Sequence, residues 1–297
     1  MDFLRPTTWR EALAAKAERP GALPLQGGTD VMVEINFDVR RPEALLDLTG
    51  VAELREWSVA GGVCRLGAGV TYATVIDELG GALPGLAQAA RTVGSPQIRN
   101  RGTVGGNLGA ASPAGDSHPP LLAAGAAVEV ESRERGIRTI PADAFYLGVK
   151  RSALEPDELI RAVRVPVAAG PQYFSKVGTR NAMVIAVCSF ALALHPQERR
   201  VGTGIGSAAP TPLRAPEAED FLSGELDWDA GGPSPSGRPA KGLDAGLLRR
   251  FGELCAAAAA PIDDVRGTAA YRRHAVAVMA RRTLTWAWDD HRGRRAA

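Results

Sequence analysis

Small and polar residues dominate the stretch at 98–120, which reads IRNRGTVGGNLGAASPAGDSHPP. Its glycines allow backbone N–H groups to approach a ligand closely, and consecutive N–H groups in such turns can form a concavity for an anion. Thr103, Asn107 and Ser112 add hydrogen-bonding side chains, and Asp116 adds a carboxylate that can accept from sugar hydroxyls. Because the stretch holds almost no large apolar residue, we predict a loop that binds phosphate and sugar and adds nothing to the core. A plain glycine-rich connection between two strands remains the alternative.

A second glycine turn lies earlier in the chain, in the sequence PLQGGTDVMV at 24–33, where Gly27-Gly28 leads into an apolar run. Two such turns far apart in the sequence could hold one extended cofactor from two sides. Neither turn matches the other phosphate-binding signatures. The sequence has no G-x-x-x-x-G-K-[ST], and no G-x-G-x-x-G opens a helix after a strand with an acidic residue about 20 positions later.

The segments QGGTDVMVE and IRNRGTVGGNLGAASPAGD together resemble the flavin-binding subunits of the molybdenum hydroxylases. That family includes the flavoprotein of carbon monoxide dehydrogenase and the flavin domain of xanthine dehydrogenase. DELIRAVRVP at 157–166 and SKVGTRNAMVIAVCSFALAL at 175–194 extend the resemblance. The order and spacing of these segments also agree, so the resemblance covers essentially the whole chain.

The resemblance implies FAD as the cofactor and assigns roles to two loops. The first loop lies along the pyrophosphate of the flavin and the adjoining chain, and it corresponds to Leu25, Gln26, Gly27, Gly28, Thr29, Asp30 and Val31. The second pyrophosphate loop corresponds to Thr103, Gly105, Gly106 and Asn107.

Three further positions receive roles from the resemblance. Asp116 corresponds to an acid that binds the sugar-like part of the flavin, Ile160 to an apolar residue near the adenine end, and Lys176 to a lysine that approaches the ring. A cation there would stabilise an anionic reduced flavin. Two positions depart from the family. Val184 stands where an Asp is frequent, which puts the polar contact of that acid in doubt, and Ala110 replaces a residue that is hydroxylated in some relatives.

No residues in the sequence form a recognisable acid–base or metal site. The sequence has no H-E-x-x-H, no C-x-x-C pair and no clustered carboxylates. His118 is the one histidine near the glycine loops, and we interpret it as a loop residue at the rim. A covalent link from flavin to His118 is conceivable, although the resembled family binds flavin noncovalently. Because a flavin carries its own redox chemistry, cofactor loops without acid–base machinery suit electron or hydride transfer.

The resemblance implies an oxidoreductase component: the FAD-carrying electron-transfer subunit of a three-component molybdenum hydroxylase. A molybdopterin-binding large subunit would oxidise the substrate, and a [2Fe–2S] small subunit would pass electrons to FAD. The flavin would then reduce NAD⁺ or another acceptor. The expected assembly is a dimer of heterotrimers. The alternatives are a self-contained FAD-dependent oxidase and a non-catalytic nucleotide-binding or assembly module.

The composition of the chain limits which partners and which cellular location are expected. The 297 residues carry a net charge of +2 and no basic stripe interleaved with aromatics, so nucleic acid is not expected as a partner. No apolar run approaches the roughly 20 residues that span a bilayer, and the first residues lack the apolar stretch of a signal peptide. Cys64, Cys188 and Cys255 are sparse and far apart, which suits a reducing compartment. We therefore expect a cytoplasmic protein without a membrane partner.

The element pattern and the resemblance together predict an α+β fold of the molybdenum hydroxylase flavoprotein (PCMH-like) type. Residues 1–167 would form a FAD-binding domain with subdomains at about 1–55 and 56–167. Residues 172–290 would form a smaller α+β domain with an antiparallel sheet and helices.

Local patterns place the individual elements. Thr8 and Glu11 form a capping-box pattern for a helix at 7–19, and Asp30 either caps the following helix or faces the ligand. A low-complexity segment at 229–243 is predicted to be a mobile surface loop. Further helices are predicted at 72–79, 86–91, 121–124, 216–222, 244–258 and 268–288, strands at 23–25, 44–48, 126–131, 137–140, 159–165, 173–177, 186–193 and 201–205, a hairpin at 51–69, and a short helix or turn at 143–150.

Overall fold

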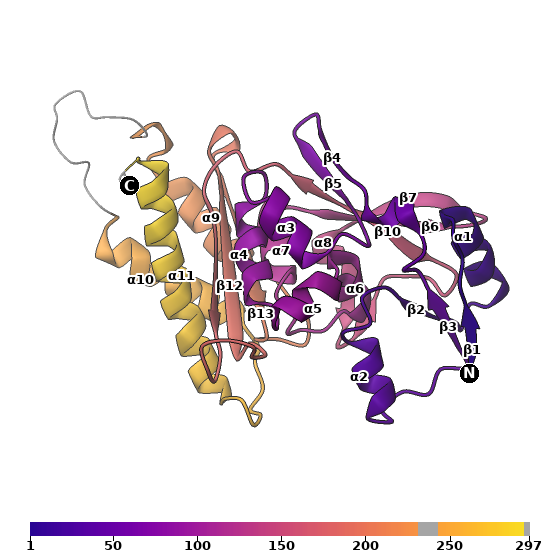
Figure 1. Ribbon diagram of the computed structural model, residues 1–297. Coiled ribbons are helices and arrows are strands. Elements are labelled where there is room, and N and C mark those ends of the chain that lie inside the picture. Colours follow the sequence, from indigo (N-terminus) through magenta and orange to yellow (C-terminus); the bar gives the residue numbers. More distant parts are fainter. Residues whose placement is uncertain (231–242, 294–297) are drawn as a thin grey trace.

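The chain is built from a small parallel sheet, a five-stranded antiparallel sheet and a three-stranded antiparallel sheet, with helices between and around them (Figure 1). The computed structural model describes residues 1–230 and 243–293. Most of the predicted mobile loop at 229–243 therefore lies outside the described residues. The mixture of helices and sheets confirms the α+β fold predicted from the sequence.

The parallel sheet has the strand order β1-β3-β2, in which the strands predicted at 23–25 and 44–48 lie next to each other. α1 begins directly after Thr8. The Thr8 side chain accepts from the Glu11 N–H, and the Glu11 carboxylate accepts from the Thr8 N–H, so the predicted capping box is present. The bounds are β1 Asp2–Leu4, α1 Trp9–Glu18, β2 Leu23–Leu25, α2 Val31–Asn36 and β3 Ala44–Asp47.

The five-stranded sheet has the order β4-β5-β10-β6-β7, and every neighbouring pair is antiparallel. The predicted hairpin at 51–69 is confirmed, because β4 and β5 pair around Gly61 and Gly62, which both have positive φ. The bounds are η1 Ala52–Arg55, β4 Trp57–Ala60, β5 Val63–Gly67, α3 Tyr72–Glu78, α4 Pro84–Thr92, β6 Ala127–Ser132, β7 Gly136–Pro141, α8 Ala142–Phe145, β8 Tyr146–Gly148, β9 Arg151–Ser152 and β10 Leu159–Pro166.

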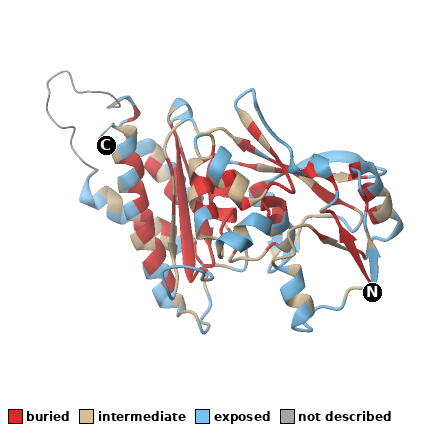
Figure 2. Ribbon diagram, in the orientation of Figure 1, coloured by how far each residue is buried: buried red, intermediate tan, exposed pale blue. Residues whose placement is uncertain are grey.

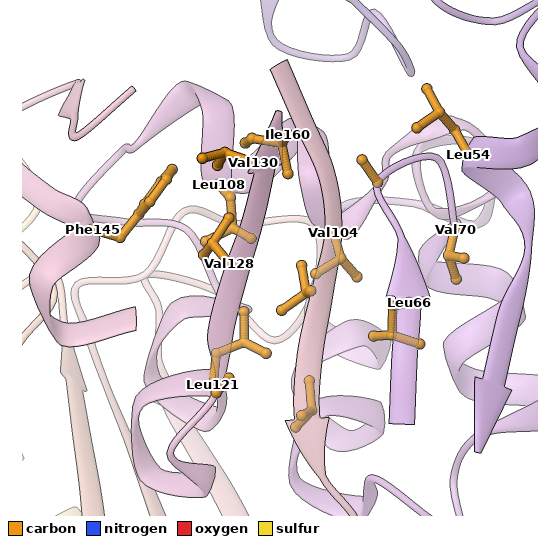
Figure 3. Packing of buried hydrophobic residues seen from close by; sticks show 14 of the residues in the cluster. Leu54, Leu66, Val70, Val104, Leu108, Leu121, Val128, Val130, Phe145 and Ile160 are labelled. Atoms are coloured by element: carbon orange, nitrogen blue, oxygen red, sulfur yellow. The ribbon is translucent and has the colours of Figure 1, made fainter. Parts of the chain in front are cut away.

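The central glycine-rich stretch is more helical than predicted. Three short helices, α5 Pro96–Arg101, α6 Val104–Ala110 and α7 His118–Ala124, occupy much of it. The prediction that this stretch adds nothing to the core is wrong, because Leu108 is fully buried beside Val128 and Val130 of β6 (Figure 3). Its small residues let α6 approach the sheet closely.

The three-stranded sheet confirms the antiparallel arrangement predicted for the C-terminal part. α7 packs on β12 and β13, and α11 packs on β12 from the other side (Figure 1). Helices thus cover both faces of β12, and all of its residues are buried (Figure 2). The bounds are β11 Gln172–Val177, β12 Cys188–His195, η2 Pro196–Glu198, β13 Arg200–Gly206, α9 Pro216–Glu225, η3 Trp228–Ala230, α10 Ala245–Ala258 and α11 Ala269–His291.

Two large hydrophobic clusters make up the core. One draws its buried residues from 9–165 and the other from 188–288. A small cluster that includes Ala123 and Phe174 joins helices of the first part to the C-terminal sheet. We keep 167–171 as the proposed boundary between the FAD-binding domain and the C-terminal domain, since each large cluster lies on one side of it.

Candidate functional site

A cavity of about 520 Å³ opens beside the two glycine turns. Its volume lies within the range of roughly 300–1,000 Å³ that is typical of small-molecule sites. Leu25 and Lys176 are the two predicted site residues that do not line the cavity. The predicted site residues that line it are Gln26, Gly27, Gly28, Thr29, Asp30, Val31, Thr103, Gly105, Gly106, Asn107, Asp116 and Ile160.

The two glycine turns lie directly against each other. A Cβ added to Gly27 would lie 2.2 Å from the carbonyl oxygen of Arg101, and a Cβ added to Gly102 would lie 3.4 Å from Thr29 Oγ1. Since the first distance is far below van der Waals contact, no larger residue fits at position 27 in this backbone. The structure thus joins turns that are distant in the sequence into one continuous wall of the cavity.

The first turn presents free hydrogen-bond donors. None of the backbone N–H groups of residues 28–31 donates to another residue that the structure describes. Gly28 has φ +74°, a left-handed conformation that favours glycine. Asp30 occupies the N-cap position of α2, but its side chain makes no capping hydrogen bond. Asp30 lines the cavity instead.

The second turn has already used its donors. The N–H groups of Val104 and Gly105 donate to the carbonyl oxygens of Val70 and Ala68, both at 3.2 Å. The Gly106 N–H donates to Thr103 Oγ1 at 2.9 Å, and the Asn107 N–H donates to the Thr103 carbonyl at 3.0 Å. The N–H groups of 104–107 are therefore already engaged within the chain, whereas those of 28–31 are not engaged by any described residue.

Two cavity-lining residues each carry a buried acceptor oxygen without a partner among the described residues. Gln26 Oε1 and Asp116 Oδ1 make no hydrogen bond to any described residue, although both residues line the cavity. A buried acceptor that stays unpaired costs about 1–3 kcal/mol. These two oxygens keep the capacity to accept hydrogen bonds from donors of a ligand, such as hydroxyl groups.

The other carboxylates at the cavity, apart from Asp30, are paired with cations. Glu34 of α2 accepts from Lys150 and lies 3.5 Å from Arg40, and the hydrogen bond from Lys150 holds the pKa of Glu34 below its usual value. Glu158 is almost fully buried. Burial alone would raise its pKa, but hydrogen bonds from Arg138 at 2.7 Å help to hold that pKa low. None of these paired groups is a free general base.

Several cavity residues were missed from the sequence. Val93 and Gly94 form a further turn at the cavity, which the sequence analysis did not identify as part of the site. Met183, Val184 and Ile185 enter from the loop before β12. Val184, which stands in the place of the family's frequent Asp, packs so closely on Gly178 that a Cβ there would lie 2.3 Å from Val184 Cγ1. This position is therefore an apolar packing position in the present chain.

His118 does not lie at the rim, so that interpretation is wrong. It starts α7, is fully buried, and its Nδ1 lies 2.8 Å from the Tyr146 hydroxyl. Burial lowers the pKa of His118 to about 3, so the ring is neutral at physiological pH. His118 is not among the cavity-lining residues, and the structure gives no support to a covalent link with flavin.

Metal and membrane sites were searched over residues 1–230 and 243–293. Within that part of the chain, no group of three or more His, Cys, Asp or Glu side chains could hold a metal ion. No helix within the same residues is both long enough and apolar enough to cross a bilayer.

Comparison with known proteins identifies the class. Residues 1–168 match the family described as "FAD binding domain in molybdopterin dehydrogenase", and the chain belongs to that family. Its cofactor is therefore FAD, as the family resemblance had implied.

Individual relatives agree with this assignment. The putative xanthine dehydrogenase FAD-binding subunit of Escherichia coli is 34% identical over 229 residues, which cover 73% of this chain and 77% of that protein. The carbon monoxide dehydrogenase medium chain of Afipia carboxidovorans is 31% identical over 290 residues, 95% of both proteins. A solved carbon monoxide dehydrogenase from Hydrogenophaga pseudoflava matches with a TM-score of 0.85 at 28% identity, over 98% of both chains. The chain is thus an FAD-binding subunit of the molybdenum hydroxylase type.

Proposed function

We propose that this chain relays electrons through FAD from a [2Fe–2S] small subunit to NAD⁺ or another acceptor. The enzyme would also contain a molybdopterin-binding large subunit that oxidises the substrate. The observation that best supports a dinucleotide here is the combination of free donors at 28–31 with the unpaired acceptors of Gln26 and Asp116 at one cavity. A flavin dinucleotide requires both, because it carries an anionic diphosphate and a polyhydroxylated chain.

The chain's residues divide the binding task between them. The N–H groups of 28–31 would hold the diphosphate, while Asp116 Oδ1 and Gln26 Oε1 would accept from hydroxyl groups. Ile160, which is 8% exposed, offers an apolar contact for the adenine end. Thr103, Gly105, Gly106 and Asn107 form the wall on which the first turn rests. FAD, once bound, supplies the redox chemistry itself.

Exposed apolar side chains around the cavity support a protein partner at its mouth. Phe37 and Val39 follow α2 and are 77% and 74% exposed, and Leu147 and Val149 in the β8–β9 hairpin are each 59% exposed. The ion pair between Glu34 and Lys150 joins these two elements. Exposed apolar side chains that gather on one surface mark interaction sites.

We propose that the [2Fe–2S] small subunit covers this surface, since an electron donor must come close to the flavin. The relatives named as medium chain or FAD-binding subunit support such an assembly, and we propose a dimer of heterotrimers. The free, buried thiols of Cys64, Cys188 and Cys255 support a cytoplasmic location. A pull-down from the source cell with mass spectrometry should recover both partner subunits; recovery of neither contradicts the assembly.

The self-contained oxidase receives less support. Such an enzyme needs a base at the substrate, and every cavity carboxylate except Asp30 is paired with Lys or Arg. Turnover of candidate alcohols by the purified chain alone would favour the oxidase. The purely structural alternative has a simple test as well, because a protein purified yellow with a flavin absorption band is not an empty assembly module.

The cofactor assignment is tested by Gly106→Val. A Cβ at Gly106 would lie 2.9 Å from Thr103 Oγ1 and would project at the cavity wall. We expect the variant to fold with a wild-type circular dichroism spectrum but to purify with little flavin. Gly81→Val is the matched control, because a Cβ there meets nothing within 4 Å and Gly81 does not line the cavity. Full flavin content in Gly106→Val contradicts the loop assignment.

A further inference from the structure

A buried ion pair connects the C-terminal sheet to the cofactor cavity. Lys176 of β11 places Nζ 2.5 Å from Asp116 Oδ2, and both side chains are 8% exposed. Nζ also donates to the Thr92 carbonyl at 3.2 Å, and the Thr92 hydroxyl lies 3.2 Å from the same carboxylate oxygen. Lys176 therefore reaches the cofactor site from the three-stranded sheet, which contributes few other residues to that site.

The two oxygens of Asp116 have different surroundings. Oδ2 receives every contact from Lys176 and Thr92, whereas Oδ1 is buried and has no partner among the described residues. Asp116 lines the cavity, and neither Lys176 nor Thr92 does. The ammonium group thus sits behind the carboxylate as seen from the cavity, and Oδ1 is the oxygen left for a ligand.

We propose that Lys176 is a positioning residue that acts on FAD through Asp116, rather than a group that touches the flavin. Lys176 and Thr92 fix Oδ2, keep the carboxylate ionised, and leave Oδ1 to accept from a hydroxyl of the flavin's sugar-like chain. This inference rests on the proposed FAD function. It assigns to the C-terminal sheet an indirect part in cofactor binding.

The charges around Asp116 make this role measurable. Burial raises the pKa of Asp116, and the charge and hydrogen bond of Lys176 oppose that rise, as does the Thr92 hydroxyl. Of the other titratable groups nearby, Tyr72 of α3 has its pKa raised by burial and stays neutral, and His118 of α7 is neutral as well. Asp30 also lines the cavity and adds negative charge. Lys176 thus supplies the positive charge that opposes the effect of burial on the pKa of Asp116.

The test is the affinity of the full apo chain for FAD between pH 6 and pH 9, followed by quenching of flavin fluorescence. The wild type should show a flat profile. Lys176→Met should bind progressively more weakly as pH falls, by up to about tenfold per pH unit, because Asp116 takes up one proton. Asp116→Asn should be flat and roughly tenfold weaker throughout, since a neutral acceptor replaces a charged one.

The double variant Lys176→Met/Asp116→Asn tests the proposal even if Lys176→Met alone fails to fold. The double variant removes both charges of the ion pair and therefore leaves no unpaired buried charge. Its affinity should equal that of Asp116→Asn. A further loss on adding Lys176→Met, or a shifted flavin absorption band, shows that lysine contacts the flavin and overturns the proposal.

A control separates this effect from simple loss of a buried lysine. Lys16 is 7% exposed, donates to the carbonyl oxygens of Pro20 and Ala22, and does not line the cavity. Lys16→Met should lose stability but keep a flat pH profile for FAD. A flat profile in Lys176→Met, with a wild type that binds FAD, refutes the inference alone. A wild-type chain that takes up no FAD refutes the proposed function as well.

Discussion

The first glycine turn, at 25–31, and the second, at 103–107, differ in what their backbone N–H groups do. In the first turn, neither the donors of 28–31 nor the adjacent Gln26 oxygen has a partner within residues 1–230 and 243–293. In the second turn the donors of 104–107 are satisfied by the chain itself. The first turn is thus incomplete without a ligand, and the second is complete.

Glycine accordingly has several uses in this protein. At Gly28 it permits a positive φ, and at Gly27 it permits contact between the turns. At Gly105 it permits contact between α6 and the core, because a Cβ would lie 2.5 Å from Ala68. A glycine-rich sequence alone therefore does not show whether its donors are free. The contact at Gly27 brings the free donors onto a rigid wall.

The largest effect is expected where the two turns meet. Gly27→Ala would place Cβ 2.2 Å from the Arg101 carbonyl oxygen, so the turns must separate. Overpacking of this kind costs about 1–3 kcal/mol, and we expect roughly a hundredfold weaker FAD binding by fluorescence titration.

Gly28→Ala is the control for Gly27→Ala, because its Cβ meets only Met32 Cγ at 3.4 Å. It should cost about 1 kcal/mol for the left-handed backbone and weaken FAD binding less. Equal affinities for Gly27→Ala and the wild type would show that the turns do not act together.

A substitution in the second turn, whose donors are satisfied within the chain, should affect stability instead of FAD binding. Gly105→Ala forces α6 away from Ala68, so the free energy of unfolding of the apo chain should fall by about 1–3 kcal/mol in urea denaturation. Gly109→Ala in the same helix is the control, since its Cβ meets only Ile160 Cδ1 at 3.7 Å. It should raise stability by about 0.5–1 kcal/mol through helix propensity. If Gly105→Ala leaves apo stability unchanged, the second turn is not the rigid partner described here.

The sequence predicted best what local patterns decide. The capping box of Thr8 and Glu11, the hairpin around Gly61 and the strands of the C-terminal sheet were all predicted correctly. Glycine is a poor helix former, so α6 was missed. Its burial in the first large hydrophobic cluster and its Thr103 cap, neither of which a propensity shows, override the local preference.

The cavity was predicted only in part, for a different reason. The two turns could be recognised because their composition is unusual, but Met183 and Ile185 reach the cavity by long-range folding and carry no local signal. The family resemblance assigned Lys176 to the cofactor site, yet only the structure shows that Lys176 lies behind Asp116. Residue type suggests a role, and the contact partner decides it.

The smallest expected effect is a pH dependence of stability in the packed region that follows the second turn. It tests whether that region is as self-supporting as the second turn itself. His118 lies under this region, where a Cβ at Gly115 would lie 2.3 Å from its Nε2. Burial lowers the pKa of His118 to about 3, so between roughly pH 6.5 and that value the unfolded chain binds a proton that the folded chain does not. The free energy of unfolding should therefore fall as pH falls below about 6.5, by at most about 1.4 kcal/mol per pH unit for this group.

His118→Asn removes the titrating ring and keeps an acceptor oxygen for the Tyr146 hydroxyl. At pH 8 we expect the variant to be less stable than the wild type, because a buried ring is replaced by a smaller side chain. As pH falls toward 5 the two unfolding free energies should converge, since only the wild type loses stability through this histidine. His195, whose pKa is also lowered by burial, remains in both proteins and cancels from the difference. Urea denaturation of both apo chains at pH 8, 7, 6 and 5 measures this difference. Parallel curves would mean that His118 takes up a proton as readily in the folded chain as in the unfolded chain. The region beyond the second turn would then be less tightly packed than its contacts indicate.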